Sequence, residues 1–353
     1  MRNRIVRDQS ELVFISWAEH CNRSDSIAKR LGGKSYLIYS PFWGSRYLTA
    51  GFKYLSQSVK TLRVLLRDRP IMVLVMTPPV IACIPVWIYC KLTGARYSID
   101  AHTSAFVDKP WKSMRFVHRF FSTHAAVTLV TSEFLAQIVR SWHGNAKIVR
   151  DVPVCFAEPR HRQLNGSVNM VFISTFTRDE PLRPFLKAAR QVPDVHFYVT
   201  GRLKDAPLAL LKEAPPNVTF TDFLSDSDYV GLLLASDAAI CLTTADHTMQ
   251  RGAYEAIYLS RPVITSDFPL LHEAFSKGAV FVSSAPDDIV RGIYEMKMNL
   301  TRYRREAEEL RRAKLECWSG VANELKKLFG LKSQTGAAQH PAVRETISTF
   351  TAK

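Results

Sequence analysis

Short apolar runs recur along the chain, and polar loops and segments with apolar residues at helical spacing separate them. A continuous run of about five apolar residues is typical of a strand covered on both faces, and spacing of three and four residues is typical of a helix. Their alternation predicts an α/β fold with parallel sheets. The predicted strands are 12–16, 36–39, 71–76, 96–100, 126–131, 170–174, 196–200, 218–221, 240–243, 262–265 and 278–282.

The length of 353 residues suggests two domains. A polar stretch containing Asn165-Gly166 interrupts the alternation near the middle and is typical of a linker or turn. We therefore expect one α/β domain over residues 1–155, a linker over 156–167 and a second domain over 168–330. Residues 331–353 are polar and lack periodicity, which predicts a disordered tail.

The run from Ile71 to Leu92 is nearly long and apolar enough to cross a membrane, which takes roughly 20 residues. It contains three prolines, and Gly94 follows at a position typical of a helix end. We interpret it as a buried strand, a Thr77-Pro78-Pro79 turn and an apolar helix.

The stretch from Ile240 to Pro269 combines strand, polar loop, helix, strand and loop. Ligands of open α/β sheets bind outside the carboxyl ends of strands, and a helix start offers free N–H groups to phosphate. Arg251 and Gly252 stand at that start, and Glu255 follows one turn later, where its carboxylate can accept hydrogen bonds from a ribose diol. Alternatively, Glu255 is an ordinary helix residue that pairs locally.

A second group of candidates follows strands of the first domain. Asp100 and His102 end one strand and can both face a binding cleft, where His102 can donate to a sugar hydroxyl or move a proton. His20 and Arg23 follow the first strand and can contact an acceptor or a phosphate. The alternatives are that Asp100 caps a turn, that His102 is structural, and that His20 and Arg23 are solvated.

The segment Arg251-Gly252-Ala253-Tyr254-Glu255-Ala256, with Arg261-Pro262-Val263-Ile264 after it, resembles the late motif of retaining glycosyltransferases of family 4, which have the GT-B fold. The resemblance assigns the ribose to Glu255. Relatives carry another glutamate eight positions earlier, beside the donor sugar. His247 stands there in this chain, next to Asp246, so that role falls to one of these two.

The same resemblance concerns the loop after strand 170–174. Relatives grip the donor diphosphate there with an arginine and a lysine, at positions that align with Thr175 and Glu180. We expect other cations to replace them, with Arg178, Arg202 and Arg251 as the main candidates and Arg183 as another. Gly201 allows close backbone approach, and Gln250 precedes the phosphate-binding helix start. The donor-binding candidates are thus Glu255, Arg251, Gly252, Gln250, Arg178, Arg202, Thr175 and Gly201.

As a whole, the resemblance implies a GT-B enzyme with two Rossmann-like domains and a last helix that returns to the first domain near Trp318. It implies sugar transfer from a nucleotide-diphosphate sugar to an acceptor, with retention of configuration and with no metal or cofactor. Many relatives act on lipid-linked glycan precursors in surface polysaccharide synthesis. It therefore implies a cytoplasmic protein that is peripheral at the inner face of the plasma membrane.

The net charge of +15 indicates anionic partners. A basic helix expected over 54–69 has an apolar stripe and can lie on an anionic membrane surface, and the aromatic, basic segment 111–121 can join it. The bland interpretation is a core-facing helix with a solvated basic face. Nucleic acid is disfavoured because the chain lacks zinc spacing and RNA-recognition signatures. The six scattered cysteines suggest a reducing compartment.

Three other functions remain open from the sequence. A sugar-nucleotide epimerase shares the fold but needs more acids and histidines around the sugar. A dehydrogenase is disfavoured because no Gly-x-Gly-x-x-Gly follows a strand. A non-catalytic basic protein that binds lipid or polyanion with a decayed site would show salt-dependent binding without nucleotide binding.

Overall fold

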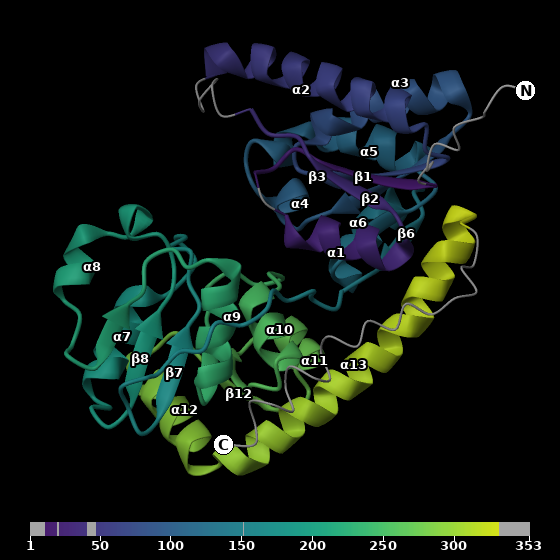
Figure 1. Ribbon diagram of the computed structural model, residues 1–353. Coiled ribbons are helices and arrows are strands. Elements are labelled where there is room, and N and C mark those ends of the chain that lie inside the picture. Colours follow the sequence, from purple (N-terminus) through teal and green to yellow (C-terminus); the bar gives the residue numbers. More distant parts are fainter. Residues whose placement is uncertain (1–10, 20, 41–46, 151, 332–353) are drawn as a thin grey trace, which may run out of the picture. The chain divides into compact units, whose positions relative to one another are not determined.

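The computed structural model describes residues 11–19, 21–40, 47–150 and 152–331. In that part the chain forms two compact units. The first runs to Val152 and resumes at Trp318, and the second runs from Pro153 to Cys317. Each contains one six-stranded sheet with helices packed on it (Figure 1). The chain is therefore α/β, as its hydrophobic pattern predicts.

The sheet of the first unit has the order β2-β1-β3-β4-β5-β6, and every neighbouring pair is parallel. Its central strands are buried along their length, which explains why they read as unbroken apolar runs. The order reverses between β1 and β3, the kind of position where open sheets bind ligands. The strands are β1 (Leu12–Ser16), β2 (Lys34–Leu37), β3 (Met72–Thr77), β4 (Arg96–Ala101), β5 (Thr128–Val130) and β6 (Ala146–Ile148).

Helices cover both faces of this sheet. In Figure 1, α2, α3 and α5 lie on one side of it and α1 lies on the other. Ser132 caps α6 by accepting a hydrogen bond from the Leu135 amide at 3.3 Å. The helical elements are α1 (Asn22–Leu31), α2 (Tyr47–Asp68), η2 (Val80–Ala82), α3 (Cys83–Thr93), α4 (Ser104–Val107), η3 (Trp111–Met114), α5 (Arg115–His124) and α6 (Glu133–Ser141).

The apolar run 71–92 forms β3, a short turn and α3, as predicted, and Gly94 ends α3 with a φ of 76°. Within the described residues no helix has both the length and the apolar character needed to cross a bilayer. Two boundaries differ from prediction. β2 begins two residues earlier, at Lys34, and α2 begins seven residues earlier, at Tyr47.

The second unit has the strand order β12-β11-β10-β7-β8-β9, again parallel throughout. Counted within the unit, this is the order 3-2-1-4-5-6 of dinucleotide-binding sheets, and the switch point lies between β7 and β10. The strands are β7 (Asn169–Phe172), β8 (His196–Val199), β9 (Val218–Phe220), β10 (Ala238–Cys241), β11 (Val263–Ser266) and β12 (Ala279–Val282). The helical elements are α7 (Leu182–Arg190), η4 (Leu203–Asp205), α8 (Leu208–Lys212), α9 (Asp226–Ala235), α10 (Arg251–Tyr258), α11 (Pro269–Ala274), α12 (Pro286–Met298) and α13 (Leu300–Phe329).

The long helix α13 belongs to both units. Its first part packs Ala307 and Leu310 into the core of the second unit. Its last part packs Trp318, Leu325 and Phe329 into the core of the first unit, on the cluster that contains β1 residues. The last helix thus returns to the first unit at Trp318. The predicted tail from residue 332 on lies outside the described residues.

Candidate functional site

The start of α10 holds a compact polar cluster around Glu255. Arg251 donates from Nε to Glu255 Oε1 at 2.9 Å, one helical turn away. Tyr229 of α9 donates its hydroxyl to the other carboxylate oxygen at 2.7 Å. The side chain of Glu255 is 11% exposed, and the two partners hold both of its carboxylate oxygens. This arrangement fixes an acceptor group at the mouth of the β7–β10 switch point.

Burial, and then the charge of Glu255, raise the pKa of Tyr229 well above its ordinary value of 10. The phenol therefore stays protonated and remains a donor to Glu255 at neutral pH. Tyr229 was not among the sequence candidates. It lies 26 residues before Glu255, and no local spacing connects the two residues.

Arg251 offers a second chemical group at this place. Its Nη2 atom is buried and has no hydrogen-bond partner among the described residues, while its side chain as a whole is 37% exposed. It stands on the first residue of an eight-residue helix, where unpaired N–H groups and the helix dipole also favour an anion. A guanidinium with an unused donor at a helix start is a suitable contact for a phosphate oxygen.

Gly252 brings this helix start close to the end of β7. A Cβ atom at Gly252 would lie 2.7 Å from Cγ2 of Ile173, the residue after β7. Only glycine therefore fits without a shift of α10 or of the strand end. Gln250 occupies the position before the helix, with an extended backbone and no side-chain capping bond.

In the loop between β7 and α7, polar side chains and amides bind the acids of the loop itself. Glu180 accepts hydrogen bonds from Ser174 Oγ at 2.5 Å, from the Thr175 amide at 3.0 Å and from Thr175 Oγ1 at 3.0 Å. The preceding acid, Asp179, accepts from Thr243 Oγ1 at 2.8 Å and so ties this loop to the end of β10. The loop thus satisfies its own two acids, with Thr175 exposed at its edge.

The cations expected in place of the missing pair lie in different settings. Arg178 is exposed in the same loop. Arg202, after β8, places its guanidinium 5.0 Å from the ring centre of Phe223, which is 63% exposed. Gly201 precedes it with a φ of 121°, and a Cβ atom there would meet the Phe176 ring at 2.7 Å. The β8 loop therefore packs directly on the β7 loop.

Asp246 and His247 form a local pair beyond β10. The His247 amide donates to Asp246 Oδ1 at 2.6 Å, and the His247 Nε2 to Asp246 Oδ2 distance is 3.7 Å. His247 adopts a left-handed φ of 60°, and both side chains are nearly half exposed. The parallel sheet places the β7, β8 and β10 loops at one edge, where the donor-binding candidates gather.

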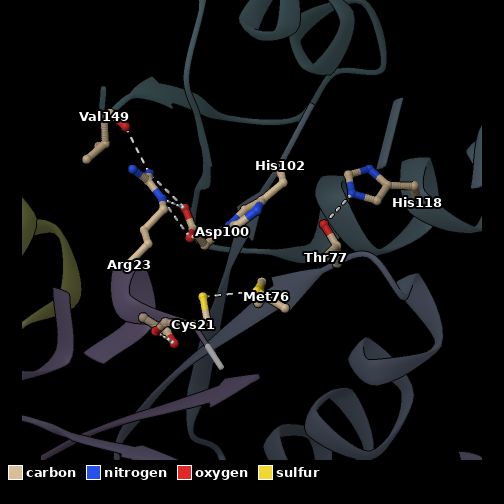
Figure 2. Close-up of polar contacts among 9 residues, drawn as sticks. Cys21, Arg23, Met76, Thr77, Asp100, His102, His118 and Val149 are labelled. Carbon is tan, nitrogen blue, oxygen red and sulfur yellow. Dashed lines mark hydrogen bonds and ion pairs between the residues drawn. The ribbon is translucent and has the colours of Figure 1, made fainter. Parts of the chain in front are cut away.

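In the first unit, the structure brings together Arg23, Asp100 and His102 (Figure 2). Arg23 from α1 binds both carboxylate oxygens of Asp100, with Nε to Oδ2 and Nη2 to Oδ1 each at 2.9 Å. Its Nη2 also donates to the Val149 carbonyl at 2.9 Å. The His102 ring stands beside the same carboxylate, with Nε2 3.5 Å from Oδ2.

The predicted residues of this group differ in exposure. Asp100 is fully buried, whereas the His102 side chain is 36% exposed, with its Nε2 atom buried beside the Asp100 carboxylate. Arg23, the predicted acceptor-side group, is 12% exposed and is bound to Asp100. His20 lies outside the described residues.

Burial alone would raise the pKa of Asp100, but attraction to Arg23, with a contribution from His102, outweighs it and holds that pKa well below its usual range. Asp100 is therefore an anion at neutral pH. A fixed carboxylate beside an imidazole orients the ring.

The described residues contain no group of three or more His, Cys, Asp and Glu side chains placed to hold a metal ion. Arg251, Arg178 and Arg202 lie on the same unit as Glu255, near the carboxyl ends of its parallel strands.

Comparison with known proteins agrees with this picture. Residues 167–299 match the model of the family described as Glycosyl transferases group 1, a range that begins just before β7 and includes α10 and α12. A search of curated proteins by sequence finds no match. Most of the second unit is thus similar to glycosyltransferases of this group.

Solved structures match over nearly the whole chain and show the GT-B fold. Sucrose-phosphate synthase from Thermosynechococcus elongatus is 12% identical, with a TM-score of 0.69 over 90% of this chain and 98% of its own. HepE from Anabaena, solved in complex with UDP and glucose, is 12% identical, with a TM-score of 0.66 over 90% and 100%. A glycosyltransferase from Rickettsia africae is 11% identical, with a TM-score of 0.63 over 91% and 98%.

Proposed function

We propose that this GT-B protein is a glycosyltransferase that moves a sugar from a nucleotide-diphosphate donor to a hydroxyl of an acceptor. The observation that carries the proposal is the Tyr229–Glu255–Arg251 cluster at the start of α10, inside the segment that matches the glycosyl transferases group 1 model. It offers a carboxylate for a diol and, on the same helical turn, an unused guanidinium nitrogen for a phosphate.

The donor nucleotide is assigned to the second unit. Glu255 accepts hydrogen bonds from the ribose, while Arg251 and the Gly252 amide contact the phosphates. Arg178 and Arg202 supply further positive charge, and Thr175, Gly201 and Gln250 shape the surrounding loops. The HepE structure with UDP and glucose supports a uridine nucleotide as the first candidate.

The reaction breaks the bond between the sugar C1 atom and the terminal phosphate oxygen and forms a bond from C1 to the acceptor oxygen, whose hydroxyl proton passes to the departing diphosphate. Negative charge grows on the departing diphosphate, and Arg251 with the α10 helix start stabilises it, so no metal ion is required in this scheme. We assign the donor-sugar contacts to Asp246 or His247. His102, oriented by ionised Asp100, is assigned to a sugar or acceptor hydroxyl. We also propose that the transferred sugar retains its anomeric configuration.

The acceptor proposed is a lipid-linked or polysaccharide precursor of a cell-surface glycan, used in the cytoplasm at the inner face of the plasma membrane. The net charge of +15 supports a phosphorylated or membrane-bound acceptor over a neutral soluble one.

The test is thermal unfolding of wild type and Glu255→Gln with UDP, GDP, ADP and dTDP. A ligand that binds only the native protein adds about 2.7 kcal/mol at a hundredfold excess over its Kd, which is about 5–10 °C in Tm for a unit of this size. We expect one diphosphate to raise the Tm of wild type and to lose most of that effect in Glu255→Gln.

Glu308→Gln is the matched control, because Glu308 is also a partly buried acid of this unit held by Arg311 and Arg312. It should keep the full response. If no diphosphate stabilises wild type, the donor assignment is wrong. Incubation of the matching sugar nucleotide without acceptor tests the epimerase alternative, since an epimerase converts it and a transferase does not.

A further inference from the structure

Helix α2 exposes its apolar side chains. Phe52 is 62% exposed, Leu55 63%, Val59 39% and Leu66 58%, and their spacing of three, four and seven residues places them along one stripe. A surface helix of a soluble protein shows the reverse pattern, with its apolar stripe toward the core.

The opposite side of α2 is anchored by polar groups. Gln57 and Thr61 are fully buried. Gln57 donates from Nε2 to the Ile38 carbonyl at 2.9 Å, and Trp17 donates from Nε1 to Thr61 Oγ1 at 2.9 Å. These bonds fix the rotation of the helix, because turning the stripe inward would leave both polar groups without partners. The buried hydrogen bonds of α2 therefore keep the apolar stripe on the exposed side of the helix.

Neighbouring helices extend the apolar surface. On α3, Ile84, Ile88 and Leu92 are 40%, 38% and 80% exposed at a spacing of four residues. On α5, Phe116 is 74% exposed and Phe120 is 44% exposed. The α3 residue Trp87 contacts the Phe120 ring edge-on, with ring centres 5.9 Å apart. Figure 1 shows α2, α3 and α5 on the same side of the sheet. We call this surface the α2–α3–α5 face.

The same face is strongly basic. Residues 47–125 contain eleven Lys and Arg, three Asp and no Glu, so this segment supplies more than half of the net charge of +15. Of the three acids, Asp100 is buried and Asp68 pairs with Arg67 and Tyr36. Cations also lie against aromatic rings, with Lys91 5.8 Å from the ring centre of Trp87.

A hollow at the edge of α2 adds a place for a charged group. It has a volume of about 370 Å³ and lies between the end of β2 and α2. Lys60 and Arg63 line it from the helix, and Tyr36 and Tyr39 line it from the strand side. Two cations with two phenol rings suit a phosphate that carries an apolar tail.

We propose that the α2–α3–α5 face docks on an anionic lipid bilayer, with the exposed apolar side chains in the acyl boundary, the cations against lipid phosphates and one headgroup in the Lys60–Arg63 hollow. Exposed apolar side chains interleaved with cations match an interface that is apolar inside and negative at its surface. A nucleic acid would use the cations but leave Phe52, Leu55, Ile88 and Leu92 without a role.

This inference rests on the proposed function only in that a lipid-linked acceptor would be met at the same bilayer. Its test is separate from nucleotide binding. Vesicle binding can fail while the UDP response stands, and the reverse can also occur, so the two failures are distinguishable.

The experiment is cosedimentation of the full chain with two kinds of vesicle. One kind contains phosphatidylcholine alone, and the other contains phosphatidylcholine with about 30% phosphatidylglycerol, which gives its surface a negative charge. We expect wild type to bind the anionic vesicles at least about tenfold more tightly than the neutral ones, and to be partly released by high salt. Lys60→Glu/Arg63→Glu should weaken anionic binding by about tenfold or more. Phe52→Gln/Leu55→Gln should weaken it by about tenfold through lost insertion, since glutamine keeps the helix.

Matched controls come from the second unit. Arg305→Glu/Arg312→Glu changes the same charge at positions that are each 75% exposed. Leu208→Gln/Met298→Gln removes apolar side chains that are 74% and 78% exposed. Both controls should bind vesicles like wild type. Equal losses in controls and test variants overturn the proposal, as does absence of vesicle binding. The proposal is also overturned if the protein binds duplex DNA more strongly than anionic vesicles and only Lys60→Glu/Arg63→Glu, not Phe52→Gln/Leu55→Gln, weakens DNA binding. That result would assign the face to a polyanion.

Discussion

At the scale of single residues, His118 of α5 is a histidine enclosed by the first unit. It is 1% exposed, and its Nε2 lies 3.1 Å from Thr77 Oγ1 (Figure 2), with the rings of Phe106 and Trp142 against it. Burial lowers the pKa of His118 from 6.5 to about 4. The folded protein therefore holds the ring neutral over a range in which the unfolded chain takes up a proton.

The consequence is a pH-dependent stability. Because the pKa of His118 is lower in the folded state than in the unfolded chain, its contribution to the unfolding free energy is full above pH 6.5. The contribution falls as the pH drops, and by about pH 4 the loss amounts to about 3 kcal/mol. We expect His118→Phe to be less stable at pH 7, because Thr77 loses its partner, but to show a flatter decline between pH 6.5 and 4. Urea unfolding across this range measures it. His143→Asn, at an exposed histidine, should keep the wild-type slope, and an unchanged slope in His118→Phe contradicts the prediction.

Residue-scale prediction from the sequence worked where the partners are neighbours along the chain. Arg251 and Glu255 are four residues apart on one helix, so their pairing can be expected from spacing alone. Arg23 and Asp100 are 77 residues apart, and their ion pair follows only from the packing of α1 on β4. The same packing explains why Asp100, predicted to face a cleft, is buried while His102 is not.

At the scale of elements, the approach of α10 to β7 depends on Gly252. We expect Gly252→Ala to cost about 1–3 kcal/mol in unfolding free energy, because the added methyl overlaps Ile173 in a packed region. It should also weaken the response to the stabilising diphosphate, since relief requires moving the helix start that carries Arg251. Thermal unfolding with and without nucleotide measures both effects.

Gly320→Ala is the matched control in helix α13, where an added Cβ meets nothing within 4 Å. It should stabilise the protein by up to about 1 kcal/mol through helix propensity and leave the nucleotide response intact. Equal behaviour of the two alanine variants would show that the contact with Ile173 does not constrain α10.

The elements themselves were largely predictable, because central parallel strands are buried on both faces and read as apolar runs. The exposed face of α2 is harder to predict from the sequence. Its apolar stripe and its basic residues were visible in the sequence, but which side meets the core was not. Gln57 and Thr61 decide it through bonds to Ile38 and Trp17, residues that lie on other elements.

At the scale of the whole molecule, the stability of the first unit depends on helix α13, which follows the second unit in the chain. Leu325 is fully buried in the cluster that also holds Leu12, Phe14 and Leu31. We expect Leu325→Ala to destabilise the first unit by about 2–5 kcal/mol through the cavity it leaves. The nucleotide-induced stabilisation, which we assign to the second unit, should persist.

Hydrogen exchange of the full chain locates the effect. Faster exchange is expected in β1 and β3 and not in β7 or β10. Leu328→Ala, at a position of the same helix that is 40% exposed, should change neither region by much. Uniform acceleration over both sheets would mean that the two units unfold together.

The order of synthesis gives α13 a further meaning. The strand that begins at Leu12 is made before the other strands of both sheets, yet the Trp318 and Phe329 side chains that complete its cluster are made after all of them. At about 5–20 residues per second, roughly 300 intervening residues take about 15–60 s to emerge from the ribosome. During that interval the nascent first unit presents an uncovered apolar surface, while the second unit, whose strands are contiguous in the chain, can finish first. A chaperone that holds the waiting surface would then set how much of the protein a cell recovers in soluble form.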